Sequence, residues 1–298
     1  MGSNQSTLLG VEADLTYTSA DFERVRTLIR EVAGITMTEA NQSLVLSRLA
    51  KHVRRLGYDG FADYLAFVTG PGRGAELQVM VNALTTNTTR FFREPYHFET
   101  LANEVMPNLI ERAKNGGRVR FWSAGCSSGE EAYSLATVVL KSFPQAASHD
   151  VRILATDINQ EVLSKARIGR YPAGGIEAVP PDLRSICFGL GSKVGDTLQV
   201  STAVKELVTF RYLNFVEPWP LRGPFDAILC RNVAIYMDAP TQSRVWAGLI
   251  SVLAPDGLLC IGHSERLGPE FAQDMTMCAR TTFKKSRSGQ NRPLDRAT

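Results

Sequence analysis

The sequence predicts an α/β protein whose mostly parallel, doubly wound sheet is preceded by an all-α N-terminal domain. From Arg118 onward, short apolar runs alternate with amphipathic helical patterns, which is typical of a parallel sheet. Residues 18–85 instead carry apolar side chains at helical spacing throughout. The length of 298 residues, with 44% hydrophobic and 21% charged residues, suits about two globular domains.

The N-terminal part predicts four helices. Ser19 can cap the first, in which apolar residues from Phe22 to Ile29 share one face, and Gly34 ends it. Further helices are expected over residues 41–56, 61–68 and 77–84. We expect residues 1–17 to be disordered and residues 18–85 to form a helical domain.

The remainder predicts strands over 119–123, 151–156, 225–230 and 257–262, with helices over 130–143, 160–166 and 240–253. Glycines and prolines interrupt this alternation over about 171–209, where we expect a small β-subdomain insertion within a domain covering 86–283. Residues 284–298 hold five basic residues against one acidic residue, so we expect a basic, disordered tail. Ligands of such sheets bind at the carboxyl ends of the strands.

Charge, hydropathy and cysteine usage exclude several classes of protein. The formal net charge of +3 is concentrated in the tail, and a near-neutral body argues against a nucleic-acid binder. No apolar run approaches the roughly 18 residues of a membrane-spanning helix, and the N-terminus lacks the pattern of a secretory signal. The five cysteines are scattered without zinc spacing, so we expect reduced thiols in a cytoplasmic protein and no metal site.

The first motif with chemical content runs from Ser123 to Glu131, between a strand and a helix. Its glycines allow a ligand to approach the backbone, but their spacing is not the GxGxxG dinucleotide fingerprint. The consecutive acids Glu130 and Glu131 would repel a pyrophosphate and suit ribose hydroxyls or a cationic ligand instead. The alternative is a plain helix N-terminus, where the helix dipole favours acids.

Three further segments lie at or near strand ends. Asp157 closes the second strand, where an acid can hold ribose hydroxyls or cap the next helix. In segment 87–95 we expect Phe91 and Phe92 to pack at the domain junction while polar side chains contact a ligand. Asn232 and Tyr236 follow the strand 225–230 and either face the crevice or serve as a turn residue and a half-buried aromatic.

Taken in order, these motifs closely resemble the chemotaxis receptor methyltransferases of the CheR family, over residues 20 to about 283. The matching segments are Asn87-x-Thr89-x-Phe-Phe-Arg93-Glu, Trp122-Ser-Ala-Gly-x-x-x-Gly-Glu130-Glu131-x-Tyr133-Ser, Ala155-Thr-Asp157-Ile, Gly169-Arg-Tyr171, Phe225-Asp-Ala-Ile-Leu-Cys-Arg231-Asn232-Val-x-Ile-Tyr236 and Gly262-His-Ser-Glu265. The departures from the family pattern are mild and fall at Cys126, Phe215, Ala234 and Met237.

The resemblance implies a Rossmann-like methyltransferase sheet and S-adenosylmethionine-dependent methylation of glutamate side chains on chemoreceptor signalling helices. The products are glutamate γ-methyl esters and S-adenosylhomocysteine. The cofactor contacts that the resemblance implies are Asn87, Thr89, Arg93, Glu130, Asp157, Asn214, Phe215, Arg231 and Asn232.

Methyl transfer to a carboxylate needs no general base, because an unperturbed Glu with a pKa of about 4.3 is ionised near pH 7. The sequence shows no Ser/His/Asp or metal constellation that would supply one, and we interpret the four histidines as structural. We therefore expect catalysis by positioning and desolvation, with Arg93 orienting a carboxylate and Tyr236 lining the methyl-transfer site.

The segment 48–55 carries Arg48, Lys51, Arg54 and Arg55 without an acid, and positions 48, 51, 52 and 55 share one helical face. A solvated basic face is the simple alternative, but the resemblance favours docking of glutamate-rich receptor helices. The insertion corresponds to the family's β-subdomain, which in some members adds a receptor C-terminal peptide to its sheet edge. We favour a member that does not need this tether.

Two other classes are alternatives: a nicotinamide-dependent dehydrogenase, and a non-catalytic module that binds the cofactor and a receptor. The first lacks the phosphate fingerprint, and intact Arg93, Asn232 and Tyr236 argue against the second. A methyltransferase acting on another protein's carboxylates is the closest rival. We expect a cytoplasmic monomer that contacts chemoreceptor cytoplasmic helices and neither nucleic acid nor the membrane interior.

Overall fold

The computed structural model describes residues 15–71, 74–189 and 193–287. The chain divides into two compact units. The first comprises the described residues up to Glu31 and Thr36–Leu84, and the second comprises Val32–Ile35 and the described residues from Thr85 onward. Within the described ranges, no helix is long and apolar enough to cross a membrane.

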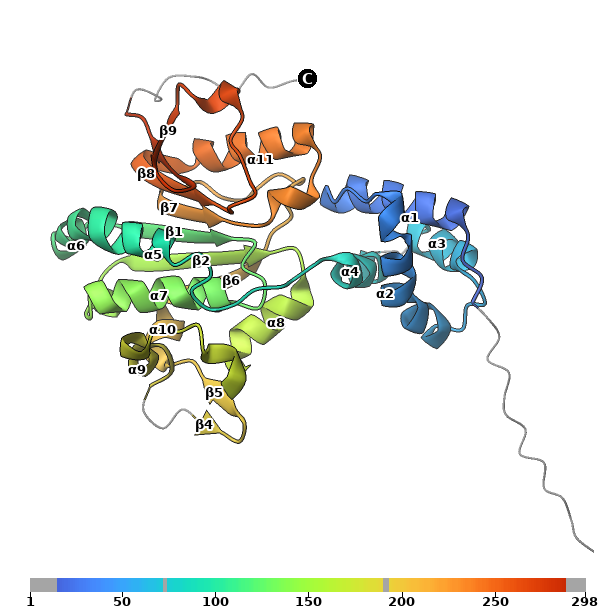
Figure 1. Ribbon diagram of the computed structural model, residues 1–298, viewed down its shortest axis with the longest axis horizontal. Coiled ribbons are helices and arrows are strands. Elements are labelled where there is room, and N and C mark those ends of the chain that lie inside the picture. The colour runs from blue at the N-terminus through green and yellow to red at the C-terminus, as the bar shows by residue number, and fades with distance from the viewer. Residues whose placement is uncertain (1–14, 72–73, 190–192, 288–298) are drawn as a thin grey trace, which may run out of the picture. The chain divides into compact units, whose positions relative to one another are not determined.

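The first unit is helical, as predicted (Figure 1), and its helices are α1 Ser19–Ala33, α2 Gln42–Arg55, α3 Phe61–Thr69 and α4 Gly74–Leu84. The prediction that Ser19 caps α1 is wrong, because Thr18 does so. The Thr18 hydroxyl accepts the Asp21 N–H at 3.2 Å, and the Asp21 carboxylate accepts the Thr18 N–H at 2.9 Å. This reciprocal pair satisfies two backbone donors at the helix start.

Residues 15–17 are also ordered, against the expectation of a disordered segment over 1–17. Thr16 forms a bridge with Gly60, in which its N–H donates to the Asp59 carbonyl and its own carbonyl accepts the Phe61 N–H, both at 3.0 Å. The Tyr17 ring lies 4.5 Å from that of Phe61. Residues 1–14 lie outside the described part of the chain.

The second unit holds a seven-stranded sheet in the order β6-β2-β1-β7-β8-β10-β9, which confirms the predicted doubly wound α/β class. β6, β2, β1, β7 and β8 are parallel, and β10 is antiparallel to both β8 and β9. The strands are β1 Val119–Ala124, β2 Val151–Asp157, β6 Val208–Tyr212, β7 Phe225–Cys230, β8 Leu253–Ile261, β9 Met275–Ala279 and β10 Thr282–Lys285.

Helices cover both faces of this sheet, with α7 and α11 on opposite sides (Figure 1). Side-chain alternation along β1 explains the two cores, because Phe121 and Trp122 point to opposite faces. Phe121 joins the core under α7, and Trp122 joins the core under α11. The helices of this unit are α5 Tyr96–Thr100, α6 Met106–Lys114, α7 Glu130–Ser142, α8 Gln160–Ile168, α9 Arg184–Phe188, α10 Thr202–Leu207 and α11 Ala239–Ser251.

The insertion is more than a hairpin. It forms a three-stranded antiparallel sheet in the order β3-β5-β4, from β3 Arg170–Pro172, β4 Lys193–Val194 and β5 Thr197–Gln199, with α9 and α10 in the same stretch. Residues 190–192 of this insertion lie outside the described ranges. The predicted tail begins too early, because Lys284 and Lys285 lie in β10, and Lys285 donates to the carbonyls of Ile250 and Leu253. Residues 288–298 of that tail are also outside the described ranges.

Candidate active site

The glycine-rich turn after β1 is bonded to the end of β2. The N–H groups of Gly125 and Cys126 both donate to the Thr156 carbonyl at 2.8 Å. Gly125 has φ +86°, and a Cβ there would lie 2.3 Å from a methyl group of Val233, so no other residue fits. Burial raises the pKa of the Cys126 thiol well above its usual value, so this thiol stays protonated and unreactive.

Asp157 fixes the same turn from the end of β2. Its carboxylate accepts the N–H of Ser127 and the N–H of Asn159, each at 2.8 Å. Burial raises the pKa of this carboxyl group, while hydrogen bonds from the backbone of Asn159, Ser127 and Ile158 oppose the rise. Asn159 caps α8 by accepting from Glu161 and Val162, which removes the interpretation of Asp157 as that helix's cap. A carboxylate has about four acceptor sites, so Asp157 retains acceptor capacity for a ligand hydroxyl.

The two consecutive acids at the start of α7 have different environments. The Glu131 carboxylate is buried and accepts from the Ser123 hydroxyl at 2.6 Å and from Arg231 Nε at 2.7 Å. Glu130 is half-buried and accepts from the Ser128 hydroxyl at 2.7 Å, and burial raises the pKa of its carboxyl group. Of the pair that the sequence placed together, Glu130 alone is available to a ligand.

Arg231 is a buried link between segments distant in sequence. Besides Glu131, it donates to the Arg93 carbonyl, and its guanidinium carbon lies 5.3 Å from the centre of the Phe98 ring. Only 5% of the residue is exposed. The resemblance implied a cofactor contact for Arg231, but the structure commits its side chain to internal partners and leaves only its backbone available for such a contact.

The turn after β7 is held by Glu265. Its carboxylate accepts four backbone N–H groups, those of Asn232 at 2.9 Å, Val233 at 2.9 Å, Ala234 at 2.8 Å and Gly262 at 2.6 Å. Burial raises the pKa of Glu265, against the lowering effect of these donors. Asn232 thereby takes the left-handed conformation with φ +60°, and its side-chain Oδ1 is buried with no partner among the described residues.

The segment 87–95 follows α4 in the sequence and contacts the glycine-rich turn after β1. The Ser127 hydroxyl donates to the Asn87 carbonyl at 2.8 Å, and Arg93 donates to the Thr88 carbonyl at 3.2 Å. Phe91 and Phe92, which the sequence predicts at a domain junction, are both buried in the core of the second unit. Phe92 and Glu94 have positive φ, at 49° and 54°, so this segment holds strained backbone of the kind that collects at functional sites.

Glu94 of this segment belongs to a network of charged and ionisable side chains. Glu94 accepts from His263 Nδ1 at 2.8 Å, and its other oxygen lies 3.6 Å from both Arg231 and His97. Although burial opposes it, hydrogen bonds from His263 and the charge of Arg231 lower the pKa of Glu94. Burial and Arg231 lower the pKa of His97 to about 4, so this histidine is neutral near pH 7. His97 thus has the structural role that the sequence suggested.

The remaining candidates lie after β6 and β7. The Asn214 side chain is buried and donates to the carbonyl of Val32 at 2.7 Å and to Glu217 at 3.0 Å. Phe215 packs near Trp122 and Trp219, with ring centres 6.4 and 5.5 Å away. The Tyr236 side chain is half-buried. Thr89 is half-buried, and the described residues offer no hydrogen bond to its hydroxyl or to that of Tyr236.

The four basic candidates on α2 differ in how far their side chains are exposed. Lys51, Arg54 and Arg55 are exposed, whereas Arg48 is half-buried and donates to the Leu84 carbonyl at 2.9 Å. Arg48 therefore stabilises the C-terminal end of α4. Among residues 15–71, 74–189 and 193–287, no group of three or more His, Cys, Asp or Glu side chains is arranged to hold a metal ion.

Comparison with known proteins assigns both parts of the chain. Residues 20–85 match the family model "CheR methyltransferase, all-alpha domain", and residues 87–284 match "CheR methyltransferase, SAM binding domain". Similar proteins include a probable chemotaxis protein methyltransferase of Rhizobium etli, 44% identical over 89% of this chain and 99% of that protein. Chemotaxis protein methyltransferase 2 of Pseudomonas aeruginosa is 40% identical over 84% and 87%, and the Salmonella typhimurium enzyme is 35% identical over 95% and 96%.

S-adenosylmethionine is the cofactor of this domain, and the residues present at the strand ends fit it. The buried, unpartnered Oδ1 of Asn232 and the half-buried carboxylate of Glu130 are acceptors suited to a ligand with hydroxyl and ammonium donors. The match of both domain models, in order and over nearly all of the chain, shows that this protein belongs to the CheR family of S-adenosylmethionine-dependent chemotaxis methyltransferases.

Proposed function

We propose that this protein transfers a methyl group to the γ-carboxylate of glutamate side chains on chemoreceptor signalling helices, forming glutamate γ-methyl esters. The observation that carries the proposal is the acceptor-lined edge at the carboxyl ends of β1, β2 and β7. This edge belongs to a chain that is similar to a chemotaxis protein methyltransferase over 95% of its length. A carboxylate substrate suits this edge because a glutamate that is already ionised needs no general base. The Cys126 thiol at this edge stays protonated, and His263 is hydrogen-bonded to Glu94.

Binding of the cofactor is assigned to Asn87, Thr89, Arg93, Glu130, Asp157, Asn214, Phe215, Asn232 and the backbone of Arg231. When bound, S-adenosylmethionine supplies an electrophilic methyl group on a sulfonium centre. Glu130 and Asp157 offer carboxylate oxygens to hydroxyl donors, and Asn232 offers its unpartnered amide oxygen. Phe215, beside Trp122 and Trp219, offers an aromatic surface to a flat ring.

Arg93 and Tyr236 are assigned to the acceptor side. The Arg93 guanidinium uses one N–H on the Thr88 carbonyl, so its other donors can orient an incoming carboxylate. A carboxylate oxygen forms the new bond to the methyl carbon as the bond to sulfur breaks, and no proton moves. The protein therefore contributes orientation and exclusion of water rather than acid–base chemistry.

Receptor docking is assigned to the basic surface of α2, formed by Lys51, Arg54 and Arg55 with Arg48 behind them. The first three are exposed, and receptor methylation helices are rich in glutamate, so the two surfaces are complementary in charge. Arg48 supports this surface indirectly, because its guanidinium is occupied by the end of α4.

The test is label transfer. The full-length protein is incubated with methyl-labelled S-adenosylmethionine and membranes that contain chemoreceptors, and receptor bands are then treated with mild base. Label that is released as methanol supports carboxyl methylation, because esters hydrolyse under these conditions. Base-stable label would contradict the proposal and indicate methylation of another group. Cofactor binding without label on any receptor would favour the non-catalytic module.

A further inference from the structure

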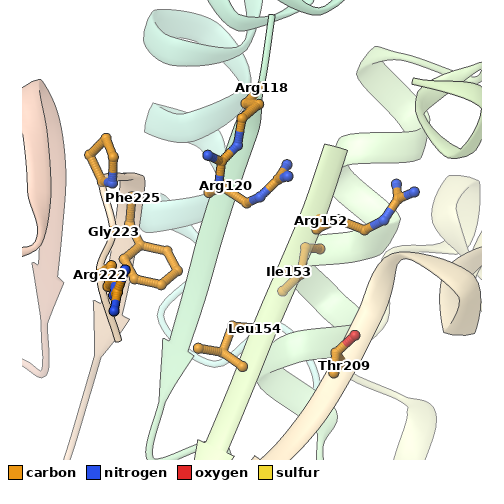
Figure 2. Close-up of a pocket in the computed structure, with 10 residues that line it drawn as sticks. Arg118, Arg120, Arg152, Ile153, Leu154, Thr209, Arg222, Gly223 and Phe225 are labelled. Carbon is orange, nitrogen blue, oxygen red and sulfur yellow. The ribbon is translucent and has the colours of Figure 1, made fainter. Parts of the chain in front are cut away.

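The opposite edge of the seven-stranded sheet carries a basic hollow that the proposed methyl transfer does not use. It lies at the amino ends of β1 and β2 and beside the segment before β7, and it encloses about 300 Å³. Four arginines line it, namely Arg118, Arg120, Arg152 and Arg222, and none of the described acidic residues does. Figure 2 shows these side chains spread around the hollow from separate segments of the chain. We call this set the basal arginine pocket.

Two of these arginines have a carboxylate partner and two do not. Asp150 lies 2.6 Å from Arg120 and 3.9 Å from Arg118. Arg152 donates only to the carbonyls of His149 and Val151, and neither it nor Arg222 has an ion-pair partner in the described part of the chain. The pocket therefore keeps an excess of positive charge that the protein does not neutralise.

The strand register places like charges side by side. Arg120 and Arg152 are direct neighbours on the parallel strands β1 and β2, where an anion bridging the two would relieve their repulsion. A concave surface lined by charges of one sign also focuses the electrostatic potential, which attracts ions of the opposite charge. The planar fork of an arginine matches the oxygens of phosphate, and several arginines at one site are typical of phosphate recognition.

The size and the rest of the lining favour a small ligand over a polypeptide. A volume of about 300 Å³ is at the lower end for small-molecule sites. Leu154, Phe225 and Pro224 give the hollow an apolar side, next to the hydroxyl of Thr209. We propose that the basal arginine pocket binds a small molecule carrying a diphosphate group, at a site separate from the cofactor edge.

The test is calorimetric titration of the full-length protein with pyrophosphate and, separately, with ADP, at low ionic strength. The double variant Arg152→Gln/Arg222→Gln removes the two arginines that lack a carboxylate partner. We expect it to weaken pyrophosphate binding at least about tenfold, because charge-assisted bonds to phosphate are lost. The control Arg26→Gln/Arg170→Gln removes two positive charges elsewhere and should change the dissociation constant by less than about twofold.

The site is supported if pyrophosphate binding is saturable and only Arg152→Gln/Arg222→Gln loses it. The affinity for S-adenosylmethionine should be the same in the wild-type protein and both double variants. If ADP binds more tightly than pyrophosphate, the apolar side of the pocket contacts the organic group of the ligand. If the two bind equally tightly, the pocket recognises the phosphates alone. The proposal is overturned if pyrophosphate binding is not saturable. It is also overturned if both double variants lose the same amount of affinity for pyrophosphate. A glutamate-rich peptide that binds more tightly than ADP, with the same variant sensitivity, would also overturn it and identify the ligand as an acidic polypeptide.

Discussion

The two edges of the seven-stranded sheet use charged side chains in opposite ways. At the carboxyl edge, Asp157 and Glu265 accept at least six backbone N–H groups between them. Arg231 is buried there and bonds Glu131 and the segment that carries Arg93. At the amino edge, Arg152 and Arg222 have no carboxylate partner within the ranges the structure describes. Buried charges at the first edge shape the backbone, whereas exposed charges at the second remain free for a ligand.

The largest expected effect comes from Arg93, a half-buried candidate at the carboxyl edge. Arg93→Ala should lower kcat/KM for receptor methylation about 100-fold, because it removes the donors that orient the acceptor carboxylate. Steady-state label transfer measures this. Arg93→Lys keeps the charge but not the fork and should recover only part of the loss. Near-normal activity of Arg93→Ala would remove the role assigned to it.

Glu265→Gln tests whether carboxyl-edge charges hold the backbone. The Gln side chain turns one acceptor into a donor facing backbone N–H groups, so we expect the free energy of unfolding to fall by about 2 kcal/mol. Denaturant melts compare it with Arg152→Gln at the amino edge, which should stay within about 0.5 kcal/mol of wild type. Equal losses in the two variants would erase the distinction between the edges.

A second basic surface, on α2, lies outside the sheet. The reversal Lys51→Glu/Arg54→Glu/Arg55→Glu should raise KM for the receptor about tenfold with little change in kcat, since it repels glutamate-rich helices. Its control is Lys114→Glu/Lys141→Glu/Lys165→Glu, which makes the same change in net charge on other exposed lysines. If KM rises equally in both proteins, the α2 surface is not a docking site.

The smallest expected effect is a pH dependence of cofactor binding. Burial raises the pKa of Glu130 and Asp157, so the folded protein takes up protons above the ordinary carboxyl range of about 4. Their contribution to stability is therefore fully present below that range and is lost as pH rises through the raised pKa values. Cofactor affinity should change in the opposite sense and fall severalfold as pH drops through the raised pKa values of these groups, because protonation removes acceptors.

Titration of binding in the variant Glu130→Gln sharpens this pH prediction. The variant should bind the cofactor more weakly at neutral pH, because one carboxylate acceptor is lost, and should show a flatter profile. A flat profile in the wild-type protein would show that these carboxyl groups do not contact the cofactor.

Much of this architecture was predictable because it depends on local pattern. The strand ends at Asp157 and Cys230 and the helix from Glu130 match the sequence predictions, since apolar runs and glycine turns mark them directly. The antiparallel strands β9 and β10 were not predicted, because β9 is largely exposed and has little apolar periodicity. The cap at Thr18 was missed because Ser19 is an equally good capping residue by type.

The partners of individual charges were not predictable, because they join residues far apart in the chain. Glu130 and Glu131 are adjacent in sequence, yet Arg231, a hundred positions away, takes only Glu131. The role of Glu265 also depends on a turn more than thirty residues earlier. The acid in Gly262-His-Ser-Glu265 was visible as part of a family pattern, but no local rule states that four backbone N–H groups surround it.

The most direct test of the central claim is mass spectrometry of receptor peptides after incubation with this protein and S-adenosylmethionine. We expect methyl esters on glutamate residues of the receptor signalling helices. They should be absent when either the protein or the cofactor is omitted, and strongly reduced with Arg93→Ala. Methyl groups on lysine, arginine or a terminal amine, or no modification of receptors that the protein binds, would contradict this expectation.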